Sequence, residues 1–119
     1  MSKPIKTYLE LVKVCRSAGL WYVGSFMSEF LEKRELWSNS ETKGQFIYHM
    51  LSEYDSGGSG SSAITRINCV IRIVESNRVK EALQMVLDCN DKKIGCEESK
   101  INARECLEDI LNGKYGYVI

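Results

Sequence analysis

Apolar residues recur every three or four positions along most of this chain, the spacing that places side chains on one face of an α-helix. The first such segment runs from Pro4 to Ala18, and Gly19 is expected to end it. Its apolar positions are Tyr8, Leu9, Leu11, Val12 and Cys15. The second and most regular segment runs from Leu20 to about Leu36. Gly24 within it costs up to about 1 kcal/mol relative to Ala, which predicts a close helix crossing or a later helix start.

Three later segments carry the same pattern. An apolar stripe covers Phe46–Tyr54, another covers Val79–Leu87, and a last helix is expected from about Glu97 to Asn112. Asn77 is a good N-cap for the Val79–Leu87 helix, because its side chain can accept a hydrogen bond from an amide of the first turn. Gly113 is the expected end of the last helix, since glycine adopts a left-handed backbone conformation without steric cost.

The segment 64–74 fits two structures. Its apolar positions 64, 67, 71 and 74 share a helical face, whereas positions 67, 69, 71 and 73 alternate with polar residues as in a strand. We favour the helix, since one strand alone cannot pair its backbone groups. The length of 119 residues fits one domain. We therefore predict a single all-α domain over residues 1–119, with five to six short amphipathic helices in one compact bundle. An α+β fold is the alternative if 64–74 is a strand.

A run of glycine and serine covers residues 56–62. Such a run is typical of a flexible loop or connector. Its amides could equally hold an anion at the start of the next helix, where the helix dipole is positive. The candidate anion-binding residues are Gly58, Gly60, Ser61, Ser62, Arg66 and Arg72. The run lacks the lysine and the preceding strand of the known nucleotide-binding loops. Binding of a phosphorylated small molecule or a nucleic-acid backbone is therefore the alternative functional hypothesis.

The charges balance over the whole chain but not within its parts. Sixteen basic and sixteen acidic residues give a formal net charge of zero, which argues against a protein that neutralises many nucleic-acid phosphates. Residues 56–80 hold four basic side chains and one acidic, while residues 81–119 hold five basic and eight acidic. The basic middle and the acidic end could pair within one monomer or across a homodimer.

Cysteine usage and hydropathy indicate the compartment. The chain has five cysteines, an odd number, and its start lacks the apolar run of a secretory signal, so we expect a cytoplasmic protein. No apolar run reaches the roughly 18 residues of a membrane span. Cys89, Cys96 and Cys106 are spaced unlike the thiolate pairs of zinc sites. We predict no metal site and no cofactor.

Catalysis has little support in the sequence. His49 is the only histidine, and no local signature of a cysteine hydrolase surrounds any cysteine. The carboxylate pairs Glu97–Glu98 and Glu108–Asp109 are adjacent in sequence, so on a helix they point in different directions. We therefore predict no catalytic residues and a protein that is not an enzyme.

Aromatic residues outside the inward stripes point instead to protein contact. Trp21, Tyr22 and Trp37 lie beside these stripes, and exposed aromatic side chains are enriched at binding hot spots. We predict that these three residues bind a partner protein. The resulting hypothesis is a non-enzymatic interaction module, of the adaptor or inhibitor type, that occupies a partner's surface and can also self-associate.

Overall fold

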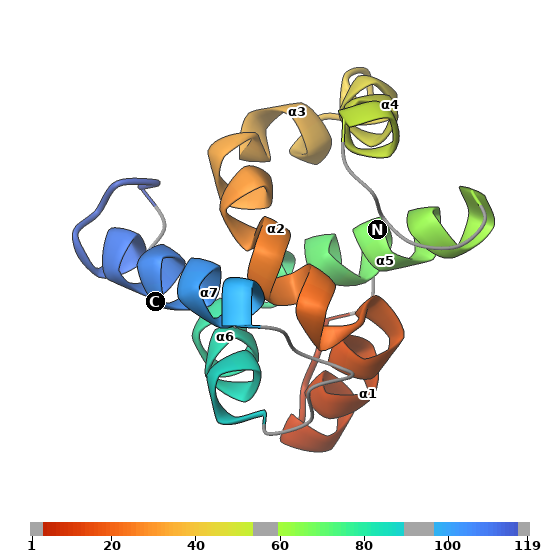
Figure 1. Cartoon of the computed structure of the whole chain (residues 1–119). Helices are drawn as coiled ribbons and strands as arrows, with labels where there is room; N and C mark the ends of the chain where they lie inside the picture. The colour runs from red at the N-terminus through yellow and green to blue at the C-terminus, as the bar shows by residue number, and fades with distance from the viewer. Residues whose placement is uncertain (1–3, 54–59, 90–96, 117–119) are drawn as a thin grey trace.

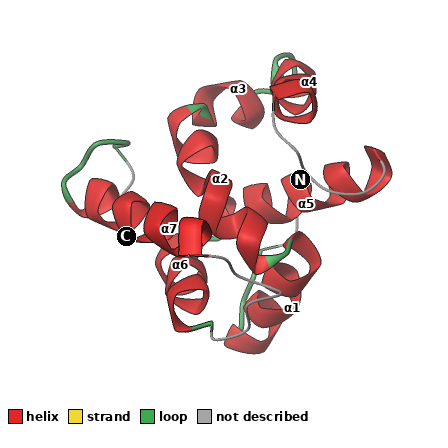
Figure 2. Ribbon diagram, in the orientation of Figure 1, coloured by secondary structure: helices red, strands yellow, loops and turns green. Residues whose placement is uncertain are grey.

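The computed structural model describes residues 4–53, 60–89 and 97–116, and all regular structure within these ranges is α-helical, as Figure 2 shows. The helices, labelled in Figure 1, are α1 (Tyr8–Ala18), α2 (Leu20–Glu32), α3 (Arg34–Ser38), α4 (Lys43–Glu53), α5 (Gly60–Glu75), α6 (Val79–Asp88) and α7 (Glu97–Leu111). The segment 64–74 lies inside α5, so the helical interpretation and the all-α fold class are confirmed. The described residues form seven helices, more than the expected five to six.

The predicted helix from Leu20 to Leu36 is two helices, α2 and α3, which meet at Lys33. The last carbonyls of a helix have no amide partner within that helix, and one of these, the carbonyl of Phe30, accepts a 2.7 Å hydrogen bond from Nε1 of Trp37. The turn at Lys33 brings the indole back to this carbonyl. The apolar spacing continues through the turn, which is why the sequence pattern predicts one helix.

The ends of α5 and α7 share one geometry. The amide of Asn77 donates to the carbonyl of Val74, and the amide of Arg78 donates to that of Ile73, while Asn77 adopts a left-handed φ of 57°. This is a Schellman motif, in which Asn is the common substitute for Gly. The prediction of Asn77 as the N-cap of the next helix is therefore wrong, because Arg78 occupies that position. Gly113, with φ of 78°, ends α7 in the same way, as predicted.

The first helix begins later than its apolar pattern predicts. Thr7 is the N-cap of α1, and its side-chain oxygen accepts a 3.1 Å hydrogen bond from the amide of Glu10. Pro4 therefore lies before the helix, not in its first turn. Gly19, with φ of 87°, ends α1 as predicted and directly precedes α2.

The core lies around α2, which packs against α1, α5, α6 and α7 (Figure 1). Its buried residues are Tyr22, Val23, Gly24, Met27, Phe30 and Leu31. Helix α1 packs along α5, and α6 packs along α7. The rings of Phe30 and Phe46 meet edge to face with centroids 5.1 Å apart, which joins α4 to the same core. Among the described residues, no helix is both long and apolar enough to cross a membrane.

Helices α2 and α7 cross closely at Gly24. A Cβ on Gly24 would lie 2.8 Å from the carbonyl oxygen of Ser99 and 2.8 Å from Cγ1 of Val86. Ser99 is fully buried and its hydroxyl donates to the carbonyl of Trp21 at 3.1 Å, while its oxygen lies 2.9 Å from that of Ser25. The close crossing that Gly24 predicts is therefore confirmed, and buried hydrogen bonds accompany it.

Replacement of Gly24 by Ala should destabilise the protein. The better helix propensity of Ala would add up to about 1 kcal/mol to the free energy of unfolding, but the new methyl group would collide with the backbone of Ser99, and overpacking of this kind costs about 1–3 kcal/mol. We expect a net loss of about 1–2 kcal/mol in urea denaturation. Gly44→Ala is the control, because a Cβ there meets no atom within 4 Å. Equal stability of the two variants would contradict the steric explanation.

Candidate functional site

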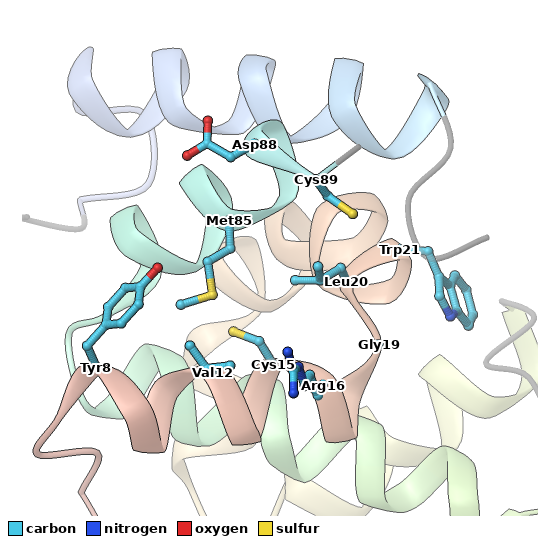
Figure 3. A pocket seen from close by; sticks show the side chains of 10 residues that line it. All are labelled: Tyr8, Val12, Cys15, Arg16, Gly19, Leu20, Trp21, Met85, Asp88 and Cys89. Carbon is cyan, nitrogen blue, oxygen red and sulfur yellow. The ribbon is translucent and has the colours of Figure 1, made fainter. Parts of the chain in front are cut away.

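The starts of α1 and α6 are held together by two hydrogen bonds. The hydroxyl of Ser76 accepts from the amide of Ile5 at 2.9 Å, and a guanidinium nitrogen of Arg78 donates to the carbonyl of Lys6 at 3.2 Å. The other terminal nitrogen of Arg78 pairs with Glu81 at 2.9 Å. From this junction both helices run in the same direction along the molecule (Figure 3).

A groove with a volume of about 720 Å³ lies between α1 and the second half of α6. Figure 3 shows its residues, which are Tyr8, Val12, Cys15, Arg16, Gly19, Leu20, Trp21, Met85, Asp88 and Cys89. The four residues from α1 recur at the spacing of one helical face. The first residues of α2 close one end of the groove, and α6 forms the facing wall.

A second hollow of about 330 Å³ shares Tyr8, Met85 and Asp88 with the first and continues along α6 past Lys80 and Gln84. The two hollows adjoin at these shared residues, and together we name them the α1–α6 groove. Its volume falls in the range of ligand-binding clefts.

The α1–α6 groove has an apolar floor and charged edges. Val12, Leu20 and Met85 are half-buried, while the charged side chains of Arg16 and Asp88 are exposed. Nε2 of Gln84 donates to a carboxylate oxygen of Asp88 at 3.0 Å. An apolar floor with few charges at its edges is typical of a binding surface.

Trp21 is the one predicted partner-binding residue that the structure places in this groove. Its ring is half-buried and stands edge-on to that of Tyr22, with centroids 5.5 Å apart. The guanidinium of Arg66 lies 5.8 Å from the Trp21 ring centroid, a cation–π distance. A Cβ on Gly19 would lie 2.9 Å from the indole nitrogen, so glycine there leaves room for the ring. The position of Trp21 is thus fixed by its neighbours.

Tyr22 and Trp37 are core residues in this structure. Their side chains are 0% and 3% exposed. Trp37 is among the residues that line a separate hollow of about 430 Å³ beside α5, but its donor nitrogen is bonded to Phe30 inside the protein. Neither ring lies on the surface of the monomer, because each completes the packing around α2. We therefore do not include either residue in the binding surface.

The residues predicted to bind an anion are not gathered at one point. Gly58 lies outside the described residues, and Gly60, Ser61 and Ser62 form the first turn of α5 instead of a loop. Arg66 and Arg72 are six residues apart on α5, which separates them by about 120° around the helix and about 9 Å along it. Arg66 lies against Trp21. Anion binding remains a prediction.

Two of the cysteines considered for catalysis, Cys15 and Cys89, line the groove, and the thiol of Cys15 is buried. Nε2 of His49 is 3.7 Å from a carboxylate oxygen of Glu29. Burial, with a smaller contribution from Cys69, raises the pKa of the Cys15 thiol to about 12, and burial raises that of Cys106 to about 12. Within the described residues, no three His, Cys, Asp or Glu side chains are placed to hold a metal ion.

Sequence reasoning missed the α6 side of the groove, Met85, Asp88 and Cys89. It also assigned Tyr8 to the inward face of its helix, whereas Tyr8 is 63% exposed. The available signal was the width of the apolar arc on α1. Its buried residues are Leu11, Val14, Cys15 and Ala18, and Tyr8 and Val12 extend beyond that face. The apolar arc of a helix that is wider than the face buried against its neighbours indicates a second contact surface.

A comparison of the chain with protein-family models, with curated proteins and with solved structures found no match.

Replacement of Trp37 by Ala should strongly destabilise the protein. It removes a buried ring and leaves a cavity, a change that costs about 3–5 kcal/mol, and it removes the donor to the Phe30 carbonyl. We expect the free energy of unfolding in urea to fall by this amount. Tyr48→Ala is the control, because Tyr48 is 73% exposed and should change it by no more than about 0.5 kcal/mol. A neutral Trp37→Ala would show that the ring is not part of the core.

The buried thiols predict a loss of stability at alkaline pH. Thiols of the unfolded chain ionise near pH 8.5, while Cys15 and Cys106 stay protonated in the fold until about pH 12. Their contribution to the free energy of unfolding is therefore complete below pH 8.5. It is lost as the pH rises toward 12, by up to about 1.4 kcal/mol per pH unit for each thiol. Urea unfolding at pH 8, 9 and 10 in a reducing buffer should show this slope. A Cys15→Ala, Cys106→Ala double variant should show a shallower one; identical slopes would contradict the assignment.

Proposed function

We propose that this protein is a non-enzymatic protein-interaction module that binds its partner in the α1–α6 groove. The single observation that carries the proposal is this groove, in which the exposed ring of Tyr8 and the half-buried side chains of Val12, Leu20 and Met85 surround one depression, with Trp21 at its end (Figure 3). Large side chains that stay partly exposed around a concave surface are typical of recognition sites.

The mechanism is burial of apolar surface at a rigid site. Trp21 is held in place by Tyr22 and Arg66. Its side chain would therefore lose little conformational freedom when a partner binds. Tyr8 is the most exposed of the large side chains in the groove, at 63%, so a partner would remove the most apolar surface from water at this residue. Arg16 and Asp88 at the edges would set orientation and association rate more than affinity.

We propose that the partner is another protein, or a second copy of this chain, and that the module acts in the cytoplasm. None of the four described cysteines forms a disulfide, which fits a reducing compartment.

Tyr8→Ala tests the proposal. The tagged full chain is expressed in its native cells, and the captured proteins are quantified by mass spectrometry. We expect recovery of the specific partner to fall at least about tenfold, since a hot-spot residue contributes about 2 kcal/mol or more. The thermal midpoint should change little, because Tyr8 is exposed in the free protein.

Tyr48→Ala is the matched control, an exposed aromatic residue on α4 outside the groove. It should leave partner recovery unchanged. Equal recovery with wild type, Tyr8→Ala and Tyr48→Ala would refute binding in this groove. Loss with Tyr48→Ala alone would place the binding surface on α4.

A further inference from the structure

We propose that the α1–α6 groove receives an amphipathic α-helix that lies antiparallel to α1 and α6, with an acidic residue opposite Arg16 and a basic residue opposite Asp88. This inference rests on the proposed function and names the chemistry of the partner.

The walls of the groove favour a helical guest over an extended one. An extended peptide needs hydrogen-bond partners for its backbone, which an exposed strand edge would supply. The described residues contain no strand, and the groove is bordered by α1 and α6, whose interior amides bond within their own helices. A guest helix satisfies its own backbone groups and needs only apolar contacts from the floor.

The length of the groove suits three turns of helix. Its α1 wall runs from Tyr8 to Gly19, a distance of about 16 Å at 1.5 Å per residue. Three turns place three or four apolar side chains on one face. The half-buried side chains of Val12, Leu20 and Met85 lie along the floor to meet them (Figure 3).

The direction of the guest follows from the helix dipoles. The bond from Arg78 to Lys6 joins the starts of α6 and α1, so the C-terminal ends of both helices lie at the end of the groove near Gly19 and Cys89. Each C-terminus carries about half a negative charge. The positive N-terminus of a guest helix is therefore favoured at this end, which makes the guest antiparallel to both walls.

The charges at the edges complete the description of the guest. Arg16 belongs only to the hollow at the Gly19 end, where the guest begins, and an acidic residue in its first turn would suit both Arg16 and the guest's own dipole. Asp88 belongs to both hollows and lies further along the groove, opposite a basic residue of the guest. Among the remaining charges, Glu81 already pairs with Arg78, and Lys80 stands at the far end.

The test is selection from a display library of capped 18-residue helices. Every member carries Leu at helical spacing, and the flanking positions are randomised over Asp, Glu, Lys and Arg. The full chain is the target, and Tyr8→Ala is used for counter-selection. We expect binders with an acid in the first turn and a basic residue further along, and Arg16→Glu should convert the selected acid into a basic residue. Lys13→Glu, an equal charge change on the same helix outside the groove, should not.

The position of a selected helix is read from alkylation of Cys89 with N-ethylmaleimide. Bound peptide should slow modification of Cys89, found in tryptic peptide 81–92, at least tenfold. Modification of Cys69, which does not line the groove and lies in tryptic peptide 67–72, should be unchanged. Protection of both cysteines, or of neither, would place the peptide elsewhere and overturn the proposal.

Three other outcomes also overturn it. In the first, no peptide binds the wild type above the Tyr8→Ala background. In the second, the selected charges do not change with Arg16→Glu. In the third, light scattering finds a dimer that Tyr8→Ala converts to a monomer, which would assign the groove to a second copy of the chain. If Tyr8→Ala abolishes capture of the cellular partner while no helix binds, the interaction function stands and the helical guest is wrong.

Discussion

The close approach of α2 and α7 at Gly24 is the constraint on which the rest of the structure depends. A Cβ there would lie 2.8 Å from both the Ser99 backbone and the Val86 side chain, so one residue without a side chain sets how near α2 lies to α7 and to α6. Ser99 can be buried only because its hydroxyl finds partners on α2. Steric fit and hydrogen bonding therefore fix the same crossing.

This crossing also determines where the groove ends. Trp21, whose carbonyl accepts from Ser99, stands three residues before Gly24, so the beginning of α2 cannot move independently of α7. Gly19 turns the chain between α1 and α2, and the groove opens where α1 follows α5 while α6 follows α7. The two walls thus belong to different helix pairs, and the junction at Arg78 joins them near their N-terminal ends.

The sequence predicts the helices of this fold well and their boundaries less well. The apolar residues of a helix recur at a spacing that places them on one buried face, and this spacing can be read from the sequence. Helix α5 was predicted in this way. Gly19 and Gly113 end their helices as predicted, because a left-handed residue is a local requirement. The break at Lys33 depends instead on a bond between Trp37 and Phe30. Asn77 has two local uses, as a helix start or as a left-handed helix end, and only the packing of α5 against α6 decides between them.

The groove was harder to predict because its residues have the character of core residues. Aromatic type alone does not distinguish a binding residue from a core ring. Tyr22 and Trp37 are buried, while Tyr8, on a face assigned to the interior, is 63% exposed. Apolar periodicity indicates that a helix face is buried against another surface. It does not indicate whether that surface belongs to the same chain. On α1 the apolar arc exceeds what α5 and α2 cover, and the excess faces α6 across a depression. This partly exposed apolar surface is the physical basis for proposing that another molecule completes the packing.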